Sequence, residues 1–340
     1  MENRYRSGEH GFESSAEGLA DKVETLFNQQ LETWALAKKN YQSLRQVEIR
    51  RIRFPEMEYQ IQFNPSRLVS AQAKVDTKSI RERTCFLCQE HLPQEQKGIY
   101  VGKGVYGLKQ DYQLLINPFP IFRKHLTIPS VVHVKQSIEG RIGDMLGLAR
   151  QLPAFTLFYN GPECGASAPD HMHFQAGCKD EMPFERAWTG MRKQILCQKN
   201  DTFLYAINES INQVLVFKGN NKDWIIDRFE RMLKYALDLP VSAGKSEPMM
   251  NLLCEYTDTE WTLSVFLRQR HRPIQYFEEG DNNRMISPGA VDLGGIIITP
   301  LNKDFRHTDK NQLEDILHQV IIDVSEFNEL STKLGETNYE

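Results

Sequence analysis

Two histidines and a glutamine recur at every second position of a short apolar run, at His171, His173 and Gln175. If residues 172–176 form a β-strand, the alternation places these three side chains on one face and the apolar residues between them on the other. A neutral imidazole is a nucleophile toward activated phosphorus, and an amide can donate hydrogen bonds to phosphoryl oxygens. The spacing therefore indicates one chemical face and one packed face, with a solvated strand edge as the alternative.

The segment before this run adds groups that suit an anionic ligand. Residues 154–160 are aromatic and β-branched and end at Asn160-Gly161-Pro162, which predicts a strand followed by a turn. The small residues from Gly165 to Ser167 follow, and such a loop lets an anion approach the backbone N–H groups closely. With donors from the side chains of Asn160 and Ser167, these segments predict a site for a phosphate ester.

Together these segments resemble the active-site signature of the histidine-triad superfamily, in its transferase branch. This branch contains galactose-1-phosphate uridylyltransferase, diadenosine tetraphosphate phosphorylase and the GDP-hexose phosphorylases, whose motif also reads His-x-His-Phe-Gln-Ala. Further similar segments occur in the same order, at residues 62–67, 85–88, 116–120 and 125–129. The resemblance is good over about residues 60 to 178 and weak elsewhere.

The resemblance implies that His173 is the nucleophile and that Gln175 replaces the third histidine of hydrolytic relatives, which favours transfer over hydrolysis. A ping-pong nucleotidyltransferase or phosphorylase acting on a nucleoside-diphosphate sugar, such as a GDP-hexose or UDP-hexose, is the leading hypothesis. Inorganic phosphate or a sugar 1-phosphate would be the acceptor. A dinucleoside polyphosphate phosphorylase or hydrolase is one alternative, and a nucleotide-binding module without catalysis is another.

Other candidate ligand contacts also follow from the resemblance. Asn64 and Arg67 lie in a matching motif, and His125 corresponds to a position near the nucleotide. For His125 the alternative is a satisfied core histidine within an apolar run.

Cys85 and Cys88 have the spacing of half a zinc site. The uridylyltransferases complete such a site with two histidines, which here would be His133 and His171, and His91 is a further candidate. Zinc would then hold the loop that presents His173, in a structural role. The alternative is a pair of buried free thiols, and no organic cofactor is expected.

The composition is that of an ordinary globular protein, with 340 residues, 40% hydrophobic and 25% charged. The net charge of -4 argues against a nucleic-acid partner. No apolar run is long enough to cross a bilayer, the N-terminus has no apolar signal segment, and the scattered cysteines do not suit a disulfide scaffold. We expect a cytoplasmic protein without a membrane partner, either monomer or homodimer.

The expected fold class is α+β, a histidine-triad-like antiparallel sheet with flanking helices in two fused, degenerate halves. Residues 1–45 would be a tail, disordered to about residue 15, and an amphipathic helix, residues 46–200 the catalytic half, and residues 201–340 the second half. Hydrophobic spacing predicts helices over about 19–34, 134–152, 225–237 and 313–327. Strands are expected at 47–54, 59–63, 113–116, 126–128, 154–160, 172–176, 251–256 and 261–268.

Helix, strand, turn and strand occur twice in this order, which indicates a weak internal duplication. The second copy has Arg268 and Arg270 near the end of its last strand, where the first copy has the histidine motif, and they are candidate clamps on phosphate or sugar. The alternative is a solvated basic hairpin end. The glycines of residues 102–107 satisfy G-x-G-x-x-G, but no amphipathic helix follows, so they predict a tight hairpin and not a dinucleotide site.

Overall fold

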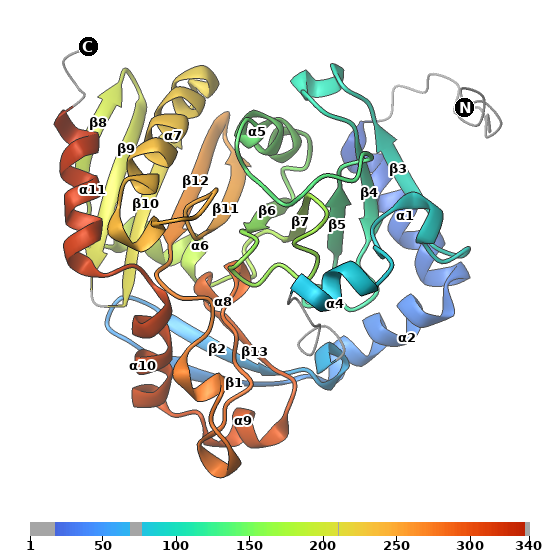
Figure 1. Ribbon diagram of the computed structural model, residues 1–340. Coiled ribbons are helices and arrows are strands. Elements are labelled where there is room, and N and C mark those ends of the chain that lie inside the picture. Colours follow the sequence, from blue (N-terminus) through green and yellow to red (C-terminus); the bar gives the residue numbers. More distant parts are fainter. Residues whose placement is uncertain (1–17, 69–76, 210, 337–340) are drawn as a thin grey trace.

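The computed structural model describes residues 18–68, 77–209 and 211–336, so the tail expected up to about residue 15 lies outside the described residues. A ten-stranded, wholly antiparallel sheet crosses the molecule in the order β3-β4-β5-β7-β6-β11-β12-β10-β9-β8 (Figure 1). Its strands are β3 (Gly98–Val101), β4 (Tyr112–Ile116), β5 (His125–Pro129), β6 (Phe155–Asn160), β7 (His173–Cys178), β8 (Gln194–Lys199), β9 (Thr202–Glu209), β10 (Asn212–Gly219), β11 (Met250–Thr257) and β12 (Glu260–Leu267).

The sheet consists of two copies of one unit. Three strands, a helix and two strands follow each other as β3 to β5, α5 (Ile142–Gln151), β6 and β7, and the order returns as β8 to β10, α7 (Lys222–Leu237), β11 and β12. Counted outward from the centre, the strand order is the same in both copies. The topology therefore confirms the α+β class and the internal duplication. The second copy also contains β8, β9 and β10, which hydrophobic spacing had not indicated.

The two copies meet where β6 pairs with β11 in antiparallel register, with Asn160 opposite Asn251. Every residue of β6 is buried. The last residue of β6 therefore lies against the start of the second copy, and this contact decides much of the site described below.

A smaller sheet, β1-β2-β13, lies below the large one in Figure 1. It contains β1 (Glu48–Arg53), β2 (Glu58–Phe63) and β13 (Ile296–Thr299), and the pairing of β13 with β2 is parallel. Chain segments more than 230 residues apart thus share one sheet. The remaining helices are α1 (Leu19–Thr33), α2 (Ala35–Ser43), α4 (Thr77–Glu82), α6 (Phe184–Ala187), α8 (Ala290–Leu293), α9 (Asn302–His307), α10 (Lys310–Val320) and α11 (Val324–Glu336).

Amphipathic spacing explains where the long helices pack. Leu19, Val23, Leu26 and Phe27 are buried on one face of α1, which lies beside β3 and β4. Helix α7 likewise buries one face and packs against α5 and α11. Such a stripe of apolar residues is the usual driving force for docking a helix on a sheet.

Two predicted helices differ from those observed. The helix expected from residue 134 begins only at Ile142, because the segment before it runs beside the histidine loop, where Met172 N donates to Val134 O and Gln136 N donates to Pro169 O. The helix expected over 313–327 is two helices, because residues 320–322 bond to the end of β12 and Ile321 is extended. Backbone hydrogen bonds to segments distant in sequence outweigh helical spacing in both places.

The glycine motif at residues 102–107 connects β3 to β4, as predicted for a hairpin. Gly104 and Gly107 have φ of 87° and 75°, a left-handed conformation that a tight turn needs and glycine adopts without strain.

The predicted boundaries at residues 45 and 200 remain predictions; β8 lies before residue 200 and pairs with β9 beyond it. Over the described ranges, no helix combines the length and apolar character that crossing a bilayer requires. The expectations of a cytoplasmic location and of a monomer or homodimer remain predictions.

Candidate active site

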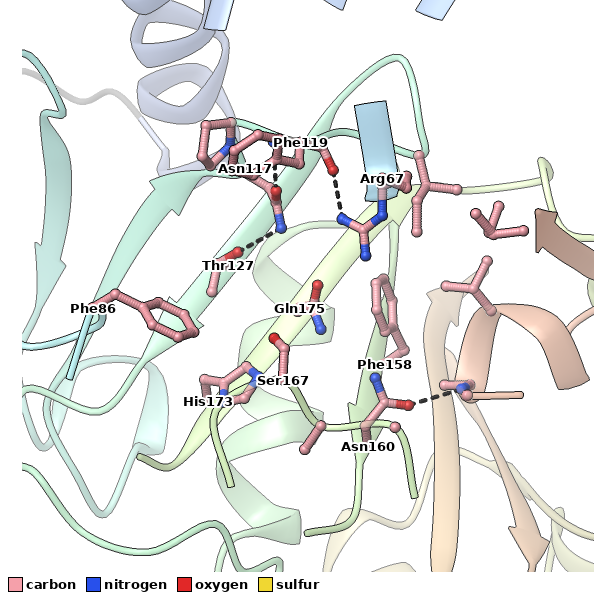
Figure 2. A pocket seen from close by; sticks show the side chains of 18 of the residues that line it. Arg67, Phe86, Asn117, Phe119, Thr127, Phe158, Asn160, Ser167, His173 and Gln175 are labelled. Atoms are coloured by element: carbon pink, nitrogen blue, oxygen red, sulfur yellow. Dashed lines mark hydrogen bonds between the residues drawn. The ribbon is translucent and has the colours of Figure 1, made fainter. Parts of the chain in front are cut away.

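A cavity of about 460 Å³ lies over the centre of the large sheet (Figure 2). Strand β7 contributes His173 and Gln175 to its lining, and β6 contributes Phe158 and Asn160. Phe174, between the two β7 residues, packs on the opposite face against Tyr112 and Tyr159. The alternation expected from the sequence is therefore present in β7, although the strand begins at His173 rather than one residue earlier.

Hydrogen bonds fix the orientation of the His173 ring. Its Nδ1 lies 2.8 Å from the carbonyl oxygen of His171, so Nδ1 carries the proton and Nε2 keeps its lone pair. Burial lowers the pKa of His173 to about 4, which keeps the imidazole neutral near pH 7. The ring lines the cavity as a neutral nitrogen base.

Gln136 holds the two central strands at this point. Its Oε1 accepts from His173 N at 2.8 Å, and its Nε2 donates to the carbonyl oxygens of Asn160 and His173 at 2.9 and 3.1 Å. One buried amide therefore satisfies backbone groups of both β6 and β7 next to the site.

His125 determines which way the Gln175 amide points. Ile121 N donates to His125 Nδ1 at 3.3 Å, so the ring proton is on Nε2 and donates to Gln175 Oε1 at 3.0 Å. The amide nitrogen of Gln175 is then available to the cavity that the residue lines (Figure 2). His125 is fully buried, and burial lowers its pKa to about 3. His125 therefore does not line the cavity as expected for a ligand contact, because the Gln175 side chain lies between it and the cavity.

Asn160, Gly165 and Ser167 line the cavity together, and their predicted contact with a ligand remains a prediction. Asn160 Oδ1 accepts from Ala290 N at 2.8 Å, so its amide nitrogen is directed into the cavity (Figure 2). Gly165 has φ of 92°, and a Cβ there would lie 3.2 Å from the Cα of Gly289. Only glycine allows the loop to approach the neighbouring backbone in this conformation.

Two guanidinium groups line the cavity. Arg67 donates from Nη1 to Phe119 O at 2.7 Å, and Arg272 donates from Nε to Ser287 Oγ at 3.2 Å while its guanidinium lies 4.1 Å from the centre of the Tyr276 ring. The acidic residue in this lining is Asp292, whose carboxylate accepts from two backbone N–H groups. Burial raises the pKa of Asp292 to about 6. The cavity therefore carries more positive than negative charge and suits an anionic ligand.

Part of the cavity lining is apolar and includes Phe86, Leu87, Leu92 and Leu115. Figure 2 shows Phe86 on the side of the cavity where His173 lies. The Phe86 side chain points into the cavity in Figure 2, is 46% exposed and carries the Arg83 guanidinium 4.9 Å from its ring centre. An exposed ring face beside a cavity can stack on a planar ligand group such as a nucleobase.

Three further predicted contacts do not line the cavity. Asn64 is buried and binds Pro120 O and Ser66 Oγ. Arg268 is 1% exposed and donates five hydrogen bonds to other protein groups, whereas Arg270 is exposed and contacts Gln319. The phosphate clamp expected at the two arginines is therefore wrong: they follow the end of β12, whereas the strand position equivalent to His173 is the start of β12.

Cys85, Cys88, His133 and His171 gather behind the site, with all four ligand atoms within 4.8 Å of one another. His171 Nδ1 lies 3.2 Å from Cys85 Sγ and 3.6 Å from Cys88 Sγ, and His133 Nδ1 lies 3.2 Å from Cys88 Sγ. A tetrahedral zinc ion with ordinary Zn–S and Zn–N bonds separates such atoms by about 3.6 Å. The residues therefore fit zinc, and His171 belongs to this cluster and not to the cavity lining.

The protonation of His171 agrees with a ligand role. Its Nε2 lies 2.7 Å from Ser130 O and donates to it, which leaves the Nδ1 lone pair facing the two sulfurs. His91 binds Cys85 O through Nδ1 and groups instead with Cys88 and Glu90. The His133 set is thus the better match to the expected site.

Sequence reasoning missed Gln136, Asn251, Arg272 and Phe86. Phe86 lies between the two cysteines and Arg272 lies two residues beyond Arg270, so their neighbours carried a signal. Gln136 and Asn251 carried none, because each acts through contacts with strands distant in sequence.

This sheet of two repeated units, with a histidine and glutamine strand next to its central pair, agrees with the fold that the sequence resemblance implies. Yeast Ap4A phosphorylase Apa2 has a similar fold, with a TM-score of 0.58 and 15% sequence identity over 84% of this chain and 96% of that chain. The resemblance is therefore confirmed for the fold.

A family model described as a domain of unknown function, DUF4922, matches residues 26–178 of this chain. A DUF4931 family protein from Bacillus cereus ATCC 10987 has a TM-score of 0.34 and 16% identity, covering 49% of this chain and 85% of that chain. No curated protein matches the sequence.

Proposed function

We propose that this chain is a nucleotidyltransferase that takes a nucleoside monophosphate from a nucleoside-diphosphate sugar onto His173. The observation that supports it most is the His173 ring, with Nδ1 bonded to a carbonyl and Nε2 left as a base in a cavity lined by amide, hydroxyl and guanidinium groups. These groups suit a phosphoryl centre better than they suit a carbonyl or a sugar carbon.

The first step forms one bond and breaks one. The Nε2 lone pair of His173 attacks the α-phosphorus, and the bond to the bridging oxygen breaks, so the sugar phosphate leaves with the electron pair. The nucleotidyl-imidazole is then a cation, which the His171 carbonyl stabilises through the proton on Nδ1. In the second step an oxygen of the acceptor attacks the same phosphorus, and the neutral imidazole leaves.

The neighbouring donors stabilise charge on the non-bridging oxygens. The amide nitrogens of Gln175 and Asn160 and the Ser167 hydroxyl line the same cavity as His173. Because hydrogen bonds to His125 and Ala290 hold both amides in place, little reorganisation is needed as the phosphorus centre changes geometry.

Two parts of the cavity lining suit the two parts of such a substrate. The apolar part with Phe86 suits the base, and Arg67 and Arg272 suit the phosphates and the phosphorylated leaving group or acceptor. A dinucleoside polyphosphate is the second candidate donor. It is supported by the similar fold of a yeast protein that is named as an Ap4A phosphorylase.

We further propose that Cys85, Cys88, His133 and His171 hold a zinc ion. Bound there, zinc would fix the loop that precedes β7 and so the carbonyl that orients His173. Its role is structural, since His171 is not in the cavity lining.

The test is the intact mass of the protein after incubation with single nucleoside-diphosphate sugars or dinucleoside polyphosphates, without acceptor. We expect a mass increase of one nucleotidyl group, a nucleoside monophosphate less one water, with one class of donor; it should be lost in His173→Ala and reversed by phosphate or a sugar 1-phosphate. Tight nucleotide binding without any adduct across the panel would instead favour a binding module.

A further inference from the structure

Arg268 is a buried cation whose donors all point at protein groups. Its Nη1 donates to Asn251 Oδ1 and Pro288 O, each at 2.7 Å, and its Nη2 donates to Arg270 O and His271 O at 3.0 and 2.9 Å. A guanidinium has only hydrogen-bond donors, so the group facing it must be an acceptor, which in an amide side chain is the oxygen. The Asn251 side chain must therefore turn its oxygen to Arg268.

This constraint passes to the next amide. With its oxygen bound to Arg268, Asn251 presents its nitrogen, which donates to Asn160 Oδ1 and to Cys164 O, each at 2.7 Å. All of these groups are buried. Asn160 must then turn its oxygen away from the cavity, and Ala290 N, the second donor to that oxygen, requires the same orientation.

We propose that Arg268 and Asn251 are positioning residues, which fix the polarity of the Asn160 amide so that its nitrogen donates to a non-bridging oxygen of the transferred phosphoryl group. This inference rests on the proposed function. It gives the second copy of the repeat a task in the reaction, although none of these contacts reaches the ligand directly. In Figure 2 the Asn160 nitrogen is directed toward Gln175, where such an oxygen would lie.

A buried amide whose polarity is wrong would oppose the reaction. An oxygen in place of the Asn160 nitrogen would repel a phosphoryl oxygen, and the loss of one such donor typically costs about 100-fold to 1000-fold in rate. Without hydrogen bonds from Asn251 and Ala290, the Asn160 amide would also populate the flipped orientation, with its oxygen toward the cavity. The guanidinium and the Ala290 N–H exclude it from both sides.

Asn251→Asp tests the relay with almost no change of shape. The new carboxylate keeps an oxygen for Arg268, and forms an ion pair with it, but places its second oxygen against Asn160 Oδ1 and Cys164 O, where the nitrogen was. We expect adduct formation from the best donor to slow about 100-fold at saturation, with the donor concentration for half-maximal rate changed less than threefold.

A double-mutant cycle separates this role from a loss of folding. In an Asn160→Ala background, Asn251→Asp should slow adduct formation less than twofold further, because the amide through which it acts is gone. Asn208→Asp is the matched control, since Asn208 forms an amide pair with Asn328 on the exposed part of β9 and should leave the rate unchanged. Thermal midpoints of all variants verify folding.

The outcomes are distinct. If wild-type protein forms no adduct with any donor, the proposed function is wrong and this inference falls with it. If wild type forms the adduct and Asn251→Asp keeps the wild-type rate, or slows it equally in both backgrounds, only the inference is overturned.

Discussion

One or two hydrogen bonds decide the orientation of each of the polar side chains His173, Gln175 and Asn160 in this cavity. The His171 carbonyl selects the tautomer of His173, and His125 turns the amide of Gln175. Each orienting group is itself buried and bonded. The chemistry therefore depends on neighbours that no ligand would touch, which is how preorganised sites lower the reorganisation that a reaction requires.

Arg272, and not Arg268 or Arg270, is the second-copy arginine that lines the cavity. Arg272→Gln should raise the donor concentration for half-maximal adduct formation about 10-fold to 100-fold, because a charge-assisted hydrogen bond contributes about 1.5–3 kcal/mol. Arg270→Gln is the matched control, since Arg270 is exposed and should leave the value within twofold. Equal effects of the two substitutions, measured as adduct rate against donor concentration, would contradict this assignment.

Glu185 should make the stability of the protein fall as pH rises. Burial raises the pKa of its carboxyl from 4.5 to about 8. Between these values the unfolded chain releases the proton and the folded chain keeps it, so the free energy of unfolding decreases with pH through this window.

We expect Glu185→Gln to remove this decrease, since an amide oxygen can still accept from Met182 N. Urea unfolding between pH 5 and 8 measures it, and at pH 8 the variant should be more stable by about 4 kcal/mol. Glu163→Gln, at an exposed carboxylate, should keep the wild-type slope. A wild-type curve without any decrease, or an unchanged slope in Glu185→Gln, would sink the idea.

At the scale of elements, the loop between β6 and β7 is irregular and contributes Gly165, Ala166 and Ser167 to the cavity lining. It is held at one end by the Cys and His cluster and at the other by the contact of Gly165 with Gly289. A loop of this kind has no regular backbone hydrogen bonds within itself, so contacts with other parts of the protein must hold its conformation.

Cys85→Ser should remove the metal and loosen this loop. We expect purified wild-type protein to contain about one zinc per chain, Cys85→Ser to contain little, and its thermal midpoint and adduct rate to fall together. Cys178→Ser, at a half-buried thiol outside the cluster, should retain metal and activity. Metal-free wild-type protein with full activity would exclude the zinc proposal.

At the scale of the whole molecule, the two copies of the repeat share one sheet and one core. Their junction buries all of β6 against β11 and brings Asn251 to Asn160. Strand β7, with the proposed nucleophile His173, belongs to one copy, and the side chains of Asn251 and Arg268 that orient Asn160 belong to the other. One copy contains the histidine motif, and the other contacts this copy through Asn251.

A chain ending at residue 200 should therefore not fold alone. It would expose the apolar edge of β6, lose β13 from the small sheet and leave β8 without β9. Such an unpaired edge favours aggregation. Denaturant unfolding of this fragment should lack the cooperative transition of the full chain, and a cooperative, monomeric fragment would contradict the expectation.

Local sequence determined what alternation and spacing can encode. The period of two in the histidine motif separated a cavity face from a core face, and apolar spacing located α1, α7 and most strands. The Cys85 and Cys88 spacing, with the resemblance, indicated a cluster that the chain forms. These features depend on neighbours along the chain, which a sequence contains.

Tertiary structure alone decided which polar side chains face the cavity. Arg268 and His125 are as polar as Arg272 and Gln175, yet burial behind a neighbour makes the first two orienting groups and leaves the second two for a ligand. The sequence could not assign them, because the choice depends on strand order and on hydrogen bonds between segments some 50 to 130 residues apart. Such contacts form only when the chain has packed, and they determine which polar side chains are buried from solvent and which stay accessible to a ligand in the cavity.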